Sequence, residues 1–206
     1  MSGESVDGFL DRLADGSPAP GGGAAAALQA ALGAALVAMV ARCTPAERFP
    51  QASPHASEIA RLADTARTHC RDAAVADEKA FAQVASAYRL PRGDEEQRLD
   101  RAAAIQEAME HATRPPLDVI EQSERIADLA ERLLPIANPN ALADLAAGVE
   151  AVRSACAASR LTVETNVAAI DDAVIRSRLR SRMGDVDTTL VRLHRLTDTV
   201  WGRLVS

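Results

Sequence analysis

The chain has 206 residues, a net charge of −6 and 48% hydrophobic residues, which argues against an intrinsically disordered protein. Aromatic residues make up only 2%, so a β-sandwich core, which relies on aromatic and β-branched side chains, is disfavoured. The acidic balance argues against a nucleic-acid partner.

Apolar residues recur at helical spacing along most of the chain, without a convincing strand-like alternation. We expect helices over about residues 5–15, 24–43, 54–88, 94–113, 116–134, 140–170 and 171–204, separated by turns rich in proline, glycine and asparagine. The pattern predicts an all-α fold, an antiparallel bundle of about six or seven helices. No linker is long enough to divide it, so residues 1–206 are expected to form a single domain.

One segment, residues 24–41, is apolar except for Gln29 and is about long enough to span a bilayer. Its side chains are mostly those of alanine and glycine, which are weakly hydrophobic, and no aromatic belt flanks it. Leu28, Leu32 and Leu36 fall at helical spacing. We therefore expect a buried, alanine-rich central helix and no membrane partner.

The three cysteines, Cys43, Cys70 and Cys156, are widely spaced and form no metal-binding pattern with histidine. Neither a disulfide framework nor a metal site is expected, which favours the reducing cytoplasm. Acidic Glu4 and Asp7 stand where a signal peptide would carry basic residues, so no signal peptide is expected.

The first candidate site is the turn Gly21-Gly22-Gly23, which directly precedes the central helix. Glycine allows close approach of the backbone, and a helix N-terminus offers unpaired N–H groups. No strand precedes the turn and no Gly-Lys-Ser/Thr follows it, so it is not a nucleotide-binding loop. A flexible turn without a ligand is the simpler alternative.

The second candidate is Asp77, which interrupts an apolar stripe in the helix expected over residues 54–88. A carboxylate in such a position is costly unless it is paired or protonated. Burial would raise its pKa and suit it to acid–base chemistry. An ion pair with an arginine is the structural alternative.

The third candidate is a stripe in the helix expected over residues 140–170. It is polar at both ends, with Asp144 at one end and Thr162 and Asn166 at the other, and small in the middle. These polar groups could line a cleft, although tight helix packing would explain the small residues equally well.

Together these segments resemble the cyclodeaminase/cyclohydrolase family of folate enzymes over about residues 5–170. Asp77-Glu78-Lys79-Ala80-Phe81 is similar to the family's Asp-x-x-Ala-Phe motif. The resemblance also rests on Ser17–Gly23 with the alanine-rich segment that follows, on Ala87–Pro91, on Ala104–Ala108, on Pro116-Leu117 and on Asn138–Leu145. The family pattern has Asn at the position of Thr162 and Ser at that of Ala143.

The resemblance implies an all-helical homodimer acting on a one-carbon adduct of tetrahydrofolate, with no cofactor besides that substrate. Asp77 corresponds to the family's acid–base aspartate, and Asp144 to a second catalytic position in its cleft. Gly21, Gly22, Gly23, Asn140, Thr162 and Asn166 correspond to substrate-binding positions.

Because no formiminotransferase segment is seen in the chain, hydrolysis of 5,10-methenyltetrahydrofolate to 10-formyltetrahydrofolate is the favoured expectation. A formiminotetrahydrofolate cyclodeaminase, which releases ammonia, is the first alternative. A non-catalytic helical dimer that binds folate or assembles a complex is the second.

Overall fold

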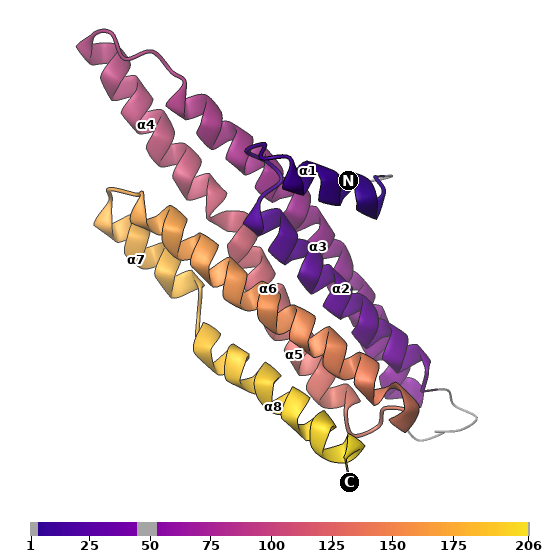
Figure 1. The fold of residues 1–206 in the computed structure, drawn as a ribbon. Helices are drawn as coiled ribbons and strands as arrows, with labels where there is room; N and C mark the ends of the chain where they lie inside the picture. Colours follow the sequence, from indigo (N-terminus) through magenta and orange to yellow (C-terminus); the bar gives the residue numbers. More distant parts are fainter. Residues whose placement is uncertain (1–3, 45–52, 206) are drawn as a thin grey trace.

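The computed structural model describes residues 4–44 and 53–205, which contain eight α-helices, one short 3-10 helix and no strand. The helices are α1 (Val6–Ala14), α2 (Gly22–Arg42), α3 (Ser53–Tyr88), α4 (Glu95–Ala112), α5 (Arg114–Leu133), η1 (Pro139–Ala141), α6 (Leu142–Ala168), α7 (Ala173–Arg182) and α8 (Val186–Leu204). Figure 1 shows them as a long bundle, which confirms the predicted all-α class.

The expected helix over 171–204 is wrong in one respect, because the structure divides it into α7 and α8. Gly184 separates the two helices with a φ of +65°, in the left-handed region that favours glycine. Asp185 then caps α8 by accepting a hydrogen bond from the Thr188 backbone N–H at 3.0 Å.

The alanine-rich helix α2 packs against α3, α5 and α6. Small residues allow a very close crossing with α6: a Cβ added at Gly33 would lie 2.3 Å from Val152 Cγ2 and 2.6 Å from the Gly148 carbonyl oxygen. α2 is long and apolar enough to cross a membrane, and 61% of its apolar stretch is buried within the bundle. The central helix is therefore covered on several sides but keeps one open side.

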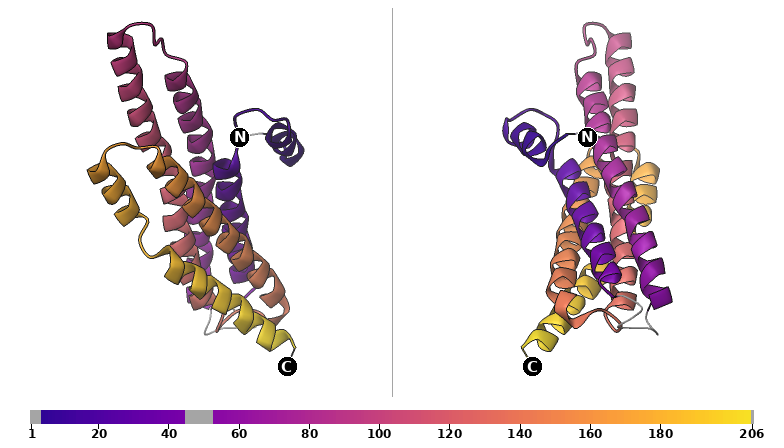
Figure 2. Two further views of the ribbon diagram at one scale, coloured as in Figure 1. Left: turned by 60° about the vertical axis from the view of Figure 1, so that its left-hand side comes forward. Right: turned by 90° about the vertical axis from the view of Figure 1, so that its right-hand side faces the viewer.

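Helix α1 stands off from the bundle at the end where α2 begins (Figure 2). Phe9 anchors it in the core. Arg12 donates hydrogen bonds to Glu4 of the preceding segment at 2.8 Å and to Glu78 of α3 at 3.0 Å. The contact with Glu78 holds the C-terminal part of α1, and with it the start of the segment that connects α1 to α2, beside α3.

At this end of the bundle, α3 extends beyond the level at which α2 begins. Asp77 of α3 lies beside Gly23, and α3 continues to Tyr88, about 16 Å further at 1.5 Å per residue. α4 packs against both α3 and α6 in this part of the bundle. The space that a longer α2 would fill is left as a cavity.

Candidate active site

The cavity above the first turn of α2 has a volume of about 450 Å³. Four helices and the α1–α2 connection surround it. Its lining residues are Pro18, Gly21, Gly22, Gly23, Asp77, Phe81, Val84, Met109, Ala112, Leu161, Thr162, Thr165 and Asn166. Of the residues predicted from the sequence, six therefore meet in one place: the three glycines, Asp77, Thr162 and Asn166.

Asp77 lies against the N-terminus of α2, and its position depends on Gly23. A Cβ at Gly23 would lie 2.1 Å from Asp77 Oδ1, so no larger residue fits beside the carboxylate. Burial raises the pKa of Asp77, a hydrogen bond from the Ala24 backbone N–H lowers it, and the charge of Glu78 raises it again. The net effect is a raised pKa, as expected for an acid–base group.

The first turn of α2 presents backbone donors to the cavity. Gly21 is the N-cap and has no side chain to occupy the free N–H groups of the turn. Nothing lies within 4 Å of a Cβ built at Gly21 or Gly22, so this part of the turn faces open space. The helix dipole adds partial positive charge, which favours an oxygen acceptor of a ligand.

Helix α6 supplies two side-chain hydrogen-bond acceptors to the cavity. Asn166 Nδ2 donates to the Ala112 carbonyl oxygen at 2.8 Å, which leaves Asn166 Oδ1 available to a ligand. Thr162 Oγ1 donates to the Ala158 carbonyl oxygen at 3.2 Å, which leaves its lone pairs available. The cavity thus offers N–H donors from α2 and oxygen acceptors from α3 and α6.

Apolar side chains form the rim, and the sequence analysis did not assign them to the site. Phe81 and Leu161 line the cavity although they are 43% and 69% exposed. Phe81 lies one helical turn after Asp77, so the spacing alone could have placed it at the site. Leu161 gave no such signal, because an exposed leucine on a long helix is ordinary.

The structure places the other two predicted site residues at the opposite end of α6. Asp144 is exposed in the first turn of that helix, and Asn140 is exposed in η1. Asp144 and Asn166 are separated by 22 helical residues, or about 33 Å. Neither Asp144 nor Asn140 lines the cavity within its own chain.

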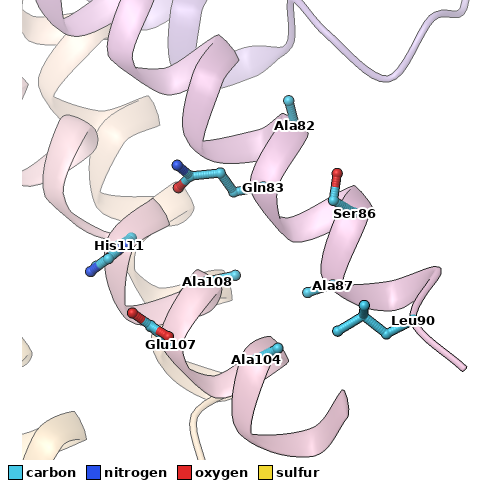
Figure 3. Close-up of a pocket in the computed structure, with 9 residues that line it drawn as sticks. All are labelled: Ala82, Gln83, Ser86, Ala87, Leu90, Ala104, Glu107, Ala108 and His111. Atoms are coloured by element: carbon cyan, nitrogen blue, oxygen red, sulfur yellow. The ribbon is translucent and has the colours of Figure 1, made fainter. Parts of the chain in front are cut away.

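A second cavity, of about 430 Å³, lies between α3 and α4 (Figure 3). Ala87, Ala104 and Ala108 form part of its lining, with the polar groups of Glu107 and His111 on α4. It includes no helix N-terminus, and its carboxylate, that of Glu107, is exposed to solvent, so the cavity at the half-buried Asp77 is the stronger candidate. Within the described parts of the chain, no group of three or more metal-ligating side chains is placed to hold a metal ion.

The negative charge of Glu78 should affect the pKa of Asp77. Glu78→Gln removes a neighbouring negative charge, so the pKa of Asp77 should fall and any activity that needs the ionised carboxylate should persist to lower pH. Arg12→Met should have the opposite effect, because it leaves the charge of Glu78 uncompensated. The measurement is kcat/KM against pH for both variants. If the acidic side of the kcat/KM profile shifted in the same direction in both variants, the result would contradict this electrostatic explanation.

The fold and the site define an all-α protein with a cavity at a helix N-terminus, lined by the partly buried carboxylate of Asp77. Residues 5–185 match the family model described as formiminotransferase-cyclodeaminase, and the chain belongs to this family. It is an enzyme of folate one-carbon chemistry, of the cyclohydrolase or cyclodeaminase kind.

Two relatives illustrate the two kinds. A methenyltetrahydrofolate cyclohydrolase of Methylorubrum extorquens is 31% identical over 98% of this chain and 97% of its own length. The mouse formimidoyltransferase-cyclodeaminase is 30% identical over 88% of this chain, which matches 34% of that longer protein. A crystal structure of formiminotetrahydrofolate cyclodeaminase from Thermotoga maritima shares the fold, with a TM-score of 0.86, 24% identity and 98% of both chains covered.

Proposed function

We propose that this enzyme hydrolyses 5,10-methenyltetrahydrofolate to 10-formyltetrahydrofolate and that Asp77 transfers the protons. The observation that carries the proposal is the position of Asp77, a carboxylate with a raised pKa in a cavity that also offers backbone donors. The nearly full-length similarity to a methenyltetrahydrofolate cyclohydrolase favours hydrolysis over deamination.

The substrate carries a positive charge spread over N5, the bridging carbon and N10. A carboxylate beside that carbon stabilises the cation and can accept a proton from the attacking water. The water oxygen forms a bond to the bridging carbon, and its proton passes to Asp77. The bond from that carbon to N5 then breaks, N5 receives the proton from Asp77, and the hydroxyl proton leaves as the formyl group forms on N10.

The polar groups of the cavity match the edge of a pteridine ring. The ring's amino and N–H groups can donate to Asn166 Oδ1 and Thr162 Oγ1, and its carbonyl oxygen can accept from the N–H groups of Gly22 and Gly23. Phe81 and Leu161 would cover the flat faces of the rings. The acceptors on α6 and the apolar side chains at the rim would together fix the position of the ring. The bridging carbon would then lie beside the Asp77 carboxylate.

The same cavity could support deamination, in which N10 attacks the formimino carbon and ammonia leaves. The similarity to part of the mouse formimidoyltransferase-cyclodeaminase is the observation that supports this second candidate. Both reactions pass through a tetrahedral carbon next to nitrogen, so Asp77 would have the same task in each. We also propose that the enzyme works as a homodimer.

The test is the loss of methenyltetrahydrofolate absorbance with the purified chain, compared with the rate without protein. We expect clear acceleration, and little or no formation of methenyltetrahydrofolate from 5-formiminotetrahydrofolate. Activity on the formimino compound alone would replace the first candidate with the second. Activity on neither compound would reject the proposed function.

A further inference from the structure

Helix α4 forms one wall of the candidate site but buries little apolar surface. Met109 and Ala112 line the cavity, and the buried residues of α4 are Ala108 and Ala112. The apolar contacts of α4 with α3 involve mainly alanines, among them Ala87, Ala104 and Ala108 (Figure 3). Because hydrophobic stabilisation scales with the apolar area buried, such small side chains hold α4 only weakly in place.

Polar contacts also hold α4, and Gln106 makes two of them. Its Nε2 donates a hydrogen bond to the Ala169 carbonyl oxygen at 3.2 Å, and its Oε1 accepts one from the Asp171 backbone N–H at 2.7 Å. Ala169 is the C-cap of α6, where carbonyl groups lack partners within the helix, and Asp171 lies in the turn that leads to α7. Both ends of the Gln106 amide are therefore used to join α4 to the end of α6.

The turn that Gln106 contacts is itself firmly held. Arg176 of α7 donates to the Ile170 and Asp171 carbonyl oxygens, each at 2.7 Å, and Ile170 is buried in the core. A further contact of α4 with α7 is the ion pair of Glu110 with Arg178, but it lies at the surface, where ion pairs contribute little. Gln106 is thus the main polar link between α4 and this anchored turn.

The position of α4 also determines the orientation of Asn166. Asn166 Nδ2 donates to the carbonyl oxygen of Ala112, at 2.8 Å, and Ala112 belongs to α4. Gln106 and Ala112 are six residues apart, or about 9 Å along the helix, so the two contacts together fix α4 against the last turns of α6. While α4 keeps this position, Asn166 Nδ2 is occupied and its Oδ1 is left for a ligand.

We propose that Gln106 is a positioning residue for substrate binding, which acts on the candidate site through α4 and the side-chain amide of Asn166. Without the Gln106 contacts, α4 can move away from α6, and the Ala112 carbonyl oxygen no longer holds Asn166 Nδ2. The amide can then turn its N–H donors towards the ligand, where an N–H group of the ring needs an acceptor. This inference rests on the proposed function, because the ring edge is the part of the substrate that Asn166 would bind.

The acid–base group does not depend on α4. Asp77 lies on α3, and it is held by the close approach of Gly23 and the N–H of Ala24, both on α2. Loss of the Gln106 contacts should therefore weaken binding of the ring and leave proton transfer nearly unchanged. The expected kinetic signature is a raised KM with an almost constant kcat.

Gln106→Met is the first test, because methionine has nearly the same length as glutamine and no amide. KM for methenyltetrahydrofolate should rise about three- to thirtyfold, the effect of one or two lost hydrogen bonds to the ring. The kcat should stay within about twofold of the wild type. Circular dichroism and thermal unfolding show whether the variant is folded. Gln106→Asn is the milder variant, since it keeps the amide but is one methylene too short to reach both partners, and it should show a smaller rise in KM.

The matched control is Gln97→Met, on the same helix. Gln97 Oε1 accepts a hydrogen bond from the Gly93 backbone N–H at 3.0 Å, near the N-terminal end of α4 and away from the cavity. This variant also removes a hydrogen bond between a glutamine side chain and the backbone, and it should keep the wild-type KM. Equal rises in KM for Gln106→Met and Gln97→Met would overturn the inference.

A double-variant cycle tests the route through Asn166. Asn166→Ala alone should raise KM, and Gln106→Met should add little in that background, because the amide that it positions is already absent. A structural role of Gln106 that is independent of Asn166 would instead give rises in KM that multiply. Multiplied rises would overturn the inference.

An unchanged KM in Gln106→Met and Gln106→Asn, or a fall in kcat larger than the rise in KM, would also overturn the inference. The proposed function would stand in these cases, because it is tested by wild-type hydrolysis and by Asp77→Asn. If the wild type acts on the formimino compound alone, the same comparison of KM with that substrate judges the role of Gln106, and only the choice of reaction is rejected. A wild type inactive on both compounds would reject the proposed function and this inference together.

Discussion

Asp77→Asn is expected to lower kcat for methenyltetrahydrofolate hydrolysis by about 10²- to 10⁴-fold, the range typical of a lost acid–base group. Asparagine keeps the shape and can still accept the Ala24 N–H through its oxygen, but it neither takes up the proton of water nor carries the charge that stabilises the cation. KM should change much less than kcat. Steady-state kinetics give the measurement, with Asp100→Asn, which changes an exposed carboxylate on α4, as control. A variant within threefold of wild type would remove Asp77 from the mechanism.

The same variant should be more stable than the wild type at neutral pH. Burial raises the folded-state pKa of Asp77, so the folded chain binds that proton more tightly than the unfolded chain does. This contribution is fully present below the ordinary pKa of aspartate and is lost as the pH rises through the raised value. Thermal unfolding of both proteins should therefore show a stability difference that grows from acidic to neutral pH. A stability difference that does not change with pH would contradict this link between the pKa of Asp77 and the stability of the fold.

Gly33→Ala is expected to destabilise the fold by about 1–3 kcal/mol or more, the cost of overpacking a tight core. Its Cβ would meet Val152 Cγ2 at 2.3 Å and the Gly148 carbonyl oxygen at 2.6 Å. A rotamer change could move Val152, but the carbonyl oxygen belongs to the backbone of α6. The two helices would have to separate.

The matched control is Gly202→Ala in α8, where nothing lies within 4 Å of the new Cβ. It should stabilise the chain by up to about 1 kcal/mol, because alanine favours helix. Urea unfolding of both variants measures the contrast. A Gly33→Ala chain as stable as the wild type would show that α2 and α6 are not as close as the structure has them.

The sequence predicted the helices well because their apolar periodicity and their proline and glycine boundaries agree. The break at Gly184 was missed although its signal was present: a glycine followed directly by Asp185, which can cap the next helix. The left-handed conformation of Gly184 and the N-cap at Asp185 end one helix and begin the next.

Part of the candidate site could also be predicted. Asp77 was recognisable because it breaks an apolar stripe, and the stripe is a local property of one helix. The role of Gly23 was not, because the contact with Asp77 joins residues that are far apart in the sequence. The cavity itself depends on where α2 begins relative to its neighbours, which periodicity does not specify. The distance between Asp144 and Asn166 follows from helix length, so the expected helix alone could have placed these two residues at its opposite ends.

The most direct test of the role of Asp77 is a crystal structure of the protein with a stable, non-hydrolysable analogue of 5,10-methenyltetrahydrofolate. The proposed mechanism predicts that the analogue lies in the cavity above α2, with its bridging carbon next to the Asp77 carboxylate and its ring edge on Asn166. An analogue bound instead in the α3–α4 cavity of Figure 3, or with its bridging carbon far from Asp77, would contradict it.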